Sequence, residues 1–228
     1  MTKRRVSLIF RSAFRQLPKM LRRVFGSSCR DCKKSHLEVE RKFKISAEEF
    51  RALSARLLSQ GFQLTGQVFM TDTFLPVLTE GDMMRLRVET MNDITKTILT
   101  RKKWVVVGGE REREETEKVT NDLAAGCLLE LGERLAAGPL PSFSKDRDLY
   151  SRLAEDEHHK IVVALDTAEG LGEYSGHYME IELLVPVDGD VAAARQQITS
   201  LAASLLGEER AFEQMSYQDM LKRSTITR

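Results

Sequence analysis

The chain has 228 residues, of which 42% are hydrophobic and 30% charged, with a formal net charge of +1. These proportions are typical of a folded soluble protein and exclude a fibrous or wholly disordered chain. No stretch reaches the roughly 18 apolar residues that a membrane-spanning helix needs. The three cysteines are too few for a disulfide framework and favour an intracellular, reducing compartment.

Although the net charge of the whole chain is close to zero, its N-terminal segment is strongly basic. Residues 1–34 hold eleven Lys or Arg and one acid, so they carry +10 and leave −9 for residues 35–228. Apolar residues recur in this segment every three to four positions with arginines between them, which is the pattern of an amphipathic helix. We therefore divide the chain into a basic leader or tail, residues 1–34, and a single domain, residues 35–228.

Three interpretations of the leader stay open. It is a mitochondrial presequence that an import receptor reads, an arm that contacts an anionic membrane or nucleic acid, or a plain basic tail. The chain is mitochondrial in the first case and cytoplasmic otherwise. For the domain itself, the net charge of −9 disfavours nucleic-acid binding.

After the leader, the sequence predicts short strands with helices between them. The first strand, 36–45, alternates charged and apolar residues, and a helix begins at Ser46, where Glu49 completes a capping box. Further strands are expected at 62–75, 84–89, 96–102, 111–119, 144–150, 160–166 and 177–185, with a hairpin turn at Gly108-Gly109. Further helices are expected at 121–136, 191–206 and 217–223. Strands joined mainly by tight turns favour an antiparallel sheet or barrel with helices outside it.

Nearly every predicted strand has one charged face and one apolar or mixed face. Two arrangements fit this pattern. In one, the apolar faces form the core and the charges are solvated; in the other, the sheet closes into a barrel with a charged interior and packs its apolar outer face under the helices. We favour the second arrangement, because the amphipathic helices need an apolar surface to cover. A charged interior is costly unless its charges are paired or bind an ionic ligand.

The charged faces indicate the chemistry of that ligand. Acids two residues apart on a strand project side by side and can share a hard cation such as Mg²⁺ or Mn²⁺. Three such pairs occur: Glu38/Glu40, Glu115/Glu117 and Glu180/Glu182. Basic residues on other strands suit phosphate oxygens, arginine through its planar fork and lysine as a point charge. The expected ligand is therefore a metal-bound polyphosphate.

The charged motifs follow one another in a definite order. They are Glu38-x-Glu40-x-Lys42, Arg85-x-Arg87, Thr100-x-Lys102, Arg113-x-Glu115-x-Glu117, Lys145-x-Arg147, Asp166, and Gly170-Leu171-Gly172-Glu173-Tyr174 leading to Glu180-x-Glu182. This order resembles that of the CYTH superfamily, the triphosphate tunnel metalloenzymes, from about residue 36 to 217. The resemblance implies an α+β fold, an eight-stranded antiparallel β-barrel or tunnel with flanking helices, that binds a triphosphate with Mg²⁺ or Mn²⁺.

The resemblance also implies a role for each charged residue. The implied metal ligands are Glu38, Glu40, Glu180 and Glu182. The implied phosphate-binding residues are Lys42, Arg85, Arg87, Lys102, Arg113, Lys145 and Arg147. The implied catalytic residues are Glu115, Glu117 and Asp166, which would hold a second metal or position water, and Lys42, which receives no acid or base role.

The expected activity is metal-dependent hydrolysis of a small-molecule triphosphate. Two alternatives remain at this point. One is a class IV adenylyl cyclase, in which the 3′-hydroxyl of a bound nucleotide attacks and the products are cyclic AMP and pyrophosphate. The other is a non-catalytic module that binds polyphosphate or a nucleotide. Inorganic, thiamine-linked, nucleoside and RNA 5′-triphosphates all stay open as substrates, and the oligomeric state is left open.

Overall fold

The computed structural model describes residues 36–77, 82–107, 110–153, 160–186 and 189–226, so the basic leader and the Gly108-Gly109 turn lie outside the described residues. Within the described ranges, the strands are β1 (His36–Ile45), β2 (Gln63–Leu75), β3 (Met83–Met91), β4 (Ile94–Val107), β5 (Glu110–Thr120), β6 (Ser142–Leu153), β7 (Lys160–Glu169) and β8 (Gly176–Pro186). The helices are α3 (Ala47–Ser59), α4 (Asp122–Ala136), α5 (Val191–Leu206) and α6 (Tyr217–Ile226), and a short 3₁₀ turn, η1 (Gly172–Tyr174), precedes β8.

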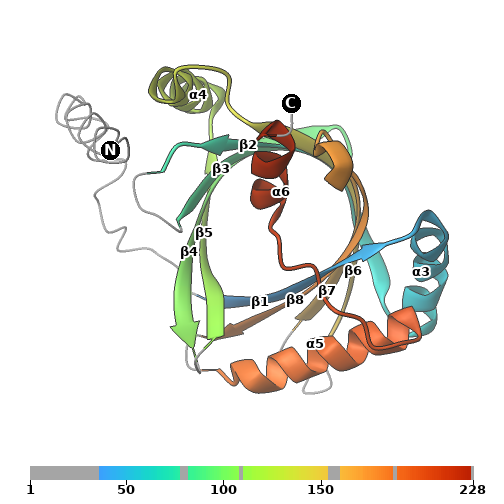
Figure 1. The fold of residues 1–228 in the computed structure, drawn as a ribbon. Coiled ribbons are helices and arrows are strands. Elements are labelled where there is room, and N and C mark those ends of the chain that lie inside the picture. The colour runs from blue at the N-terminus through green and yellow to red at the C-terminus, as the bar shows by residue number, and fades with distance from the viewer. Residues whose placement is uncertain (1–35, 78–81, 108–109, 154–159, 187–188, 227–228) are drawn as a thin grey trace.

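The strands form one closed antiparallel barrel, in the order β1-β5-β4-β3-β2-β6-β7-β8 (Figure 1). β1 pairs with β8 over its whole length. It also pairs with β5 over a shorter stretch, where Glu38 lies opposite Arg113. The predicted α+β barrel with flanking helices is confirmed.

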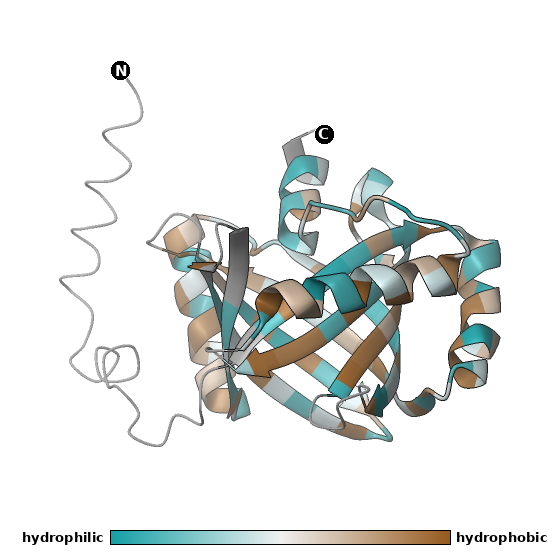
Figure 2. Ribbon diagram, turned by 90° about the horizontal axis from the view of Figure 1, so that it is seen from below, coloured by the Kyte–Doolittle hydropathy of each residue, from teal (hydrophilic) through white to brown (hydrophobic). Residues whose placement is uncertain are grey.

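The alternation along each strand separates an apolar outer face from a charged interior. On β1, the buried Val39 and Phe43 belong to the main apolar core, while Glu38 and Lys42 line the interior cavity. Figure 2 shows the consequence along single strands, where hydrophobic and hydrophilic residues follow one another. Because the side chains of a strand alternate with a period of two, the charges of the ExExK motif all reach the same face.

Helices α3 and α5 cover the outer face formed by β1, β7 and β8 (Figure 1). Leu53 and Leu57 of α3 and Ile198 and Leu205 of α5 have no exposed surface. Removing such side chains from water is the main favourable contribution to this packing. The arrangement with a charged interior and an apolar exterior under helices is therefore the observed one. No helix in the described part of the chain is both long and apolar enough to cross a membrane.

Helix α6 lies across one end of the barrel, where Figure 1 shows it within the ring of strands. Its apolar side packs into a second core cluster formed by Phe74, Phe143, Ala168, Leu171, Tyr178, Tyr217, Met220 and Leu221. Gly172 of η1 permits this close approach. Its φ is +61°, and a Cβ at this position would lie 2.9 Å from the Cβ of Ser224 on α6. A side chain there would push α6 away from the barrel.

Glu49 connects the start of α3 to the segment that precedes α6. Its carboxylate accepts hydrogen bonds from the backbone N–H of Ser46, at 2.7 Å, and from the guanidinium of Arg210, at 2.7 Å. The bond from Arg210, followed by the capping bond, lowers the pKa of Glu49 to about 2.

We expect Glu49→Gln to lower the free energy of unfolding by about 1 kcal/mol at neutral pH, because a partly screened ion pair with Arg210 is lost and the capping bond loses its charge. The wild-type carboxylate stabilises the fold above the unfolded-state pKa of about 4.3, and this contribution is lost as the pH falls toward the lower folded-state pKa. The difference between wild type and variant should therefore narrow below about pH 4. Urea denaturation at neutral and acidic pH measures it. Glu48→Gln, at an exposed site in the same turn, is the control, and equal losses in the two variants at neutral pH would contradict this role.

Candidate functional site

A cavity of about 420 Å³ occupies the barrel interior, a volume that suits a small molecule. Charged side chains from β1 to β6 and from β8 line it, together with the start of α6. The cavity brings together twelve of the predicted site residues: Glu38, Glu40, Lys42, Arg85, Arg87, Lys102, Glu115, Glu117, Lys145, Arg147, Glu180 and Glu182. Asp166 lies beneath this lining, and the side chain of Arg113 lies outside the described part of the chain.

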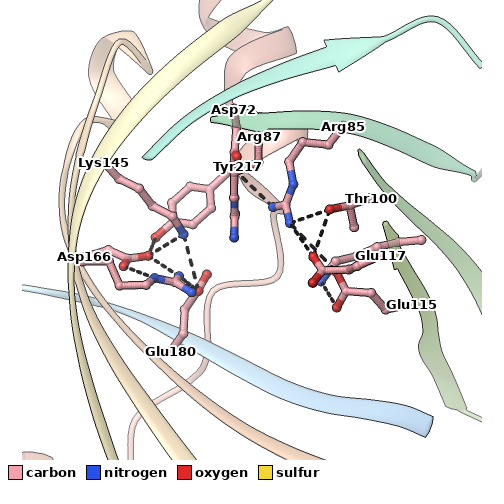
Figure 3. A network of polar contacts seen from close by, with 12 residues as sticks. Asp72, Arg85, Arg87, Thr100, Glu115, Glu117, Lys145, Asp166, Glu180 and Tyr217 are labelled. Atoms are coloured by element: carbon pink, nitrogen blue, oxygen red, sulfur yellow. Dashed lines mark hydrogen bonds and ion pairs between the residues drawn. The ribbon is translucent and has the colours of Figure 1, made fainter. Parts of the chain in front are cut away.

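Asp166 is the centre of a buried ionic cluster on β6, β7 and β8 (Figure 3). Its side chain has no exposed surface and accepts bonds from the Nζ of Lys145 at 2.9 Å and from the Nε and Nη2 of Arg147 at 2.6 Å each. Arg147 also donates to Glu180. Burial alone would raise the pKa of Asp166, but the charges of Arg147 and Lys145 outweigh it and keep the pKa low. Burial and the neighbouring Arg147 lower the pKa of Lys145 to about 8.

Asp72 on β2 forms a second cluster with the two arginines of β3. Arg87 donates from Nε and Nη2 to the two Asp72 oxygens at 2.7 and 2.9 Å, and Arg85 donates at 3.2 Å. Asp72 is 1% exposed, and the charges of Arg85 and Arg87 hold its pKa below the usual range in spite of burial. Within the described residues, the Nε–H of Arg85 is buried and has no hydrogen-bond partner. Burial and the like charge of Arg87 lower the pKa of Arg85.

Lys102 on β4 joins the acids of β1 and β5. Its Nζ lies 2.6 Å from Oε2 of Glu38 and 3.1 Å from Oε2 of Glu115. Burial raises the pKa of Glu38 more than Lys102 lowers it, and Glu115 adds to the rise. Glu117, beside this cluster, accepts a hydrogen bond from Thr100 at 3.0 Å, and its side chain is 47% exposed. Water from the cavity can therefore reach this carboxylate.

Glu40 and Glu182 differ from the other interior acids. They lie directly opposite each other on β1 and β8, and neither has a hydrogen bond or ion pair to another described side chain. Like charges in such cross-strand pairs repel. Burial, together with the charges of Glu38 and Glu40, raises the pKa of Glu182 to about 8. A cation placed between these strands would remove the repulsion.

The donor set on β1 and β8 fits a divalent metal in its chemistry, because carboxylate oxygens are the ligands that Mg²⁺ and Mn²⁺ prefer. Among the described residues, however, no three acidic, histidine or cysteine side chains converge as a ready-made cation site. The reason is visible in the pairing: Glu38 is engaged by Lys102 and Glu180 by Arg147. Completing a metal site requires these cations to turn to another anion.

Several residues of the interior were not among the predicted site residues. Asp72 and Tyr217 belong to the two buried ionic clusters, and the charged residues Asp82, Lys103, Asp219 and Lys222 also line the cavity. Asp72 falls on the same face of β2 as the cavity-lining Phe74, so the alternation of that strand carried a signal for it. Tyr217 enters from α6, and its hydroxyl donates to Oδ2 of Asp166 at 2.9 Å. No alternation along a strand could have revealed Tyr217, because it belongs to a helix that follows the last strand.

The fold and the cavity define a class of protein, a closed antiparallel barrel whose interior carries opposed acids and bases for an ionic ligand. Within that class the chain belongs to the CYTH domain family, whose family model matches residues 36–217. Solved structures with this fold include candidate adenylyl cyclases, one of them described as having a dominant triphosphatase activity. No curated protein sequence matches the chain.

Solved structures share the fold at low sequence identity. Protein PH1819 from Pyrococcus horikoshii superposes with a TM-score of 0.60 at 22% identity, covering 82% of this chain and 98% of its own. A candidate adenylate cyclase from Vibrio parahaemolyticus has a TM-score of 0.57 at 21% identity, covering 83% and 99%. A candidate adenylyl cyclase from Hippeastrum, HpAC1, described as having a dominant triphosphatase activity, has a TM-score of 0.55 at 16% identity, covering 82% and 95%.

We expect Asp72→Asn to lower the free energy of unfolding by about 3 to 5 kcal/mol, because it leaves two buried arginines without their shared carboxylate. Urea denaturation measures the loss. Asp146→Asn is the matched control, since Asp146 is an exposed acid on β6, and it should change stability by less than about 0.5 kcal/mol. A loss at Asp72 no larger than that at Asp146 would show that the arginines do not depend on this residue.

Proposed function

We propose that this chain is a triphosphatase that uses Mg²⁺ or Mn²⁺ to hydrolyse a small-molecule triphosphate in the barrel interior. One observation carries the proposal. Glu40 and Glu182, which have no partner among the described side chains, lie on β1 and β8. In the strand order β3, with Arg85 and Arg87, lies across the barrel from β8. A polyphosphate with a divalent cation is the ligand that satisfies both walls at once.

The cations of the interior fit phosphate oxygens. Arg85, Arg87 and Arg147 can each donate two parallel hydrogen bonds, and Lys102 and Lys145 add point charges. The buried Nε–H of Arg85, which has no partner among the described residues, gains one when a phosphate oxygen accepts from it. An unsatisfied buried donor costs about 1 to 3 kcal/mol, so this bond favours the anion.

The carboxylates that these cations release are those that would hold the metal. When Lys102 and Arg147 turn to phosphate, Glu38 and Glu180 join Glu40 and Glu182 as oxygen donors on the adjacent strands β1 and β8. A bound divalent cation would neutralise phosphate charge and act as a Lewis acid. Metal and triphosphate should therefore bind together more tightly than either alone, because each provides what the other displaces.

The chemistry then requires a water molecule and a stabilised leaving group. Glu117 is solvent-accessible and held by Thr100, so with Glu115 it can orient a water molecule and accept its proton. The water oxygen forms the new bond to the terminal phosphorus, and the bond to the bridging oxygen breaks. Arginine and lysine side chains stabilise the charge on the departing diphosphate. Asp166, buried beneath Lys145 and Arg147, supports these cations from below.

The products distinguish this activity from its rivals. We expect the full-length chain, freed of metal and given inorganic triphosphate, ATP or thiamine triphosphate, to release orthophosphate only after Mg²⁺ or Mn²⁺ is added. Chromatography of the products measures this. Cyclic AMP with pyrophosphate would instead identify an adenylyl cyclase. Tight metal-assisted binding without any product would identify a non-catalytic polyphosphate- or nucleotide-binding module.

Substitutions on the two walls should separate metal binding from phosphate binding. Glu40→Gln and Glu182→Gln should each lower kcat by at least about a hundredfold and raise the Mg²⁺ concentration needed for activity, because each removes a charged metal donor. Arg85→Ala should mainly raise KM, by about tenfold, through the loss of phosphate contacts. Glu173→Gln, at an exposed site in η1, is the control. A Glu40→Gln protein with full activity would refute the metal assignment.

A further inference from the structure

Tyr217 is one of the α6 residues that line the ionic interior. Its side chain is 8% exposed, and its hydroxyl donates to Oδ2 of Asp166 at 2.9 Å. Figure 3 shows Tyr217 beside Lys145 and Asp166, entering the cluster from the end of the barrel that α6 covers. Among the hydrogen bonds that Asp166 receives from described side chains, the one from Tyr217 comes from a neutral donor, whereas Lys145 and Arg147 donate as cations.

The ring of Tyr217 contacts two ammonium groups as well. The Nζ of Lys42 lies 4.0 Å from the ring centroid, and the Nζ of Lys145 lies 4.8 Å from it. A cation within about 6 Å of an aromatic ring is attracted to it, more strongly where water is excluded. One side chain therefore contacts a lysine of β1, a lysine of β6 and an aspartate of β7, which lie on three different strands of the barrel.

The position of the ring is fixed from several sides. Tyr178 packs against it edge-on with centroids 5.3 Å apart, and Phe143 lies 5.1 Å away. The residues just before α6 bind Lys42 of β1 twice. The N–H of Glu213 donates to the carbonyl of Lys42 at 2.6 Å, and the Nζ of Lys42 donates to the carbonyl of Met215 at 2.6 Å. A ring held in this way can set the place of the ammonium groups next to it.

The neutral hydroxyl gives Tyr217 a role that the cations cannot fill. When phosphate oxygens attract Lys145 and Arg147, Asp166 loses part of its compensation while it stays buried, and an uncompensated buried carboxylate is costly. Burial raises the pKa of Tyr217 well above its usual value, so the hydroxyl stays protonated and continues to donate at neutral pH. Because it is uncharged, it gains little from leaving Asp166 for the phosphate.

We propose that Tyr217 is a positioning residue of the triphosphate site, whose ring holds the ammonium groups of Lys42 and Lys145 toward the cavity and whose hydroxyl holds Asp166 when the cations bind phosphate. This inference rests on the proposed triphosphatase function. It assigns the two parts of the side chain to two different groups. The ring acts on the ammonium groups that bind the ground-state substrate. The hydroxyl acts on Asp166, whose compensation falls most in the transition state, when charge develops on the leaving diphosphate and draws Lys145 and Arg147 more strongly.

Three variants of the full-length chain test this assignment. Tyr217→Phe keeps the ring and removes the hydroxyl, whereas Tyr217→Leu removes both. Tyr178→Phe is the matched control, because Tyr178 lies in the same aromatic cluster and is fully buried, but its hydroxyl donates to the carbonyl of Tyr174 instead of Asp166. Calorimetry with inorganic triphosphate and Mg²⁺ gives Kd, phosphate release gives kcat and KM, and thermal unfolding reports stability.

Tyr217→Phe should leave Kd and KM within about threefold of wild type and lower kcat by about ten- to a hundredfold, because the reacting groups are misplaced and substrate contacts are kept. Tyr217→Leu should also raise Kd by about tenfold or more, through the loss of two cation–ring contacts. Tyr178→Phe should change Kd and kcat by less than about twofold while losing a similar hydrogen-bond contribution to stability.

Equal kcat values for Tyr217→Phe and Tyr178→Phe would overturn the role of the hydroxyl, and an unchanged Kd in Tyr217→Leu would overturn that of the ring. Tyr217→Phe still tests the inference if the leucine variant fails to fold. These results differ from a failure of the proposed function, which would show in the wild type. If the wild-type chain binds triphosphate without cleaving it, the triphosphatase function fails and the Kd values of wild type and Tyr217→Leu still test the role of the ring. If the wild-type chain neither binds nor cleaves triphosphate, both the triphosphatase function and the role of Tyr217 are overturned.

Discussion

The pairing of buried charges is the constraint on which the rest of the structure depends. Asp72 and Asp166 are at most 1% exposed, and each is bound by two basic side chains on neighbouring strands. Leaving either carboxylate alone in this interior would cost several kcal/mol, so the strands that carry their partners must lie next to them. The barrel therefore tolerates a charged interior only because strand pairing places acids against bases, while α3 and α5 remove the apolar outer face from water.

The same pairs are the source of the proposed function. A site that held only cations would bind phosphate strongly but would be difficult to fold around, since like charges buried together repel. Internal pairing removes that repulsion. In the proposed function it also allows an exchange, in which phosphate would bind the cations and metal would bind the carboxylates. Glu40 and Glu182 have no such partner among the described residues. In the proposed exchange, metal would therefore bind these two carboxylates without displacing a basic side chain.

Much of this arrangement could be predicted from the sequence because alternation is a local property. A side chain two residues further along a strand faces the same way, so Glu38, Glu40 and Lys42 had to share one face of β1. Helix α5 occupies the predicted residues 191–206, because its apolar spacing, its Asp190 cap and Gly207 after its end are also local signals. Asp72 and Tyr217, which were not predicted as site residues, are important because of their contacts with other elements.

By itself, the sequence determined which residues share a face of each strand, where the helices lie along the chain, and that a charged interior needs paired charges or an ionic ligand. These follow from the fixed periods of strands and helices and from the cost of burying charge. Only the tertiary structure decided which acid pairs with which base, because those contacts depend on barrel closure and on the order of the strands. It also decided that Tyr217, 51 residues after Asp166, contacts that carboxylate, since only the packing of α6 across one end of the barrel brings the two together.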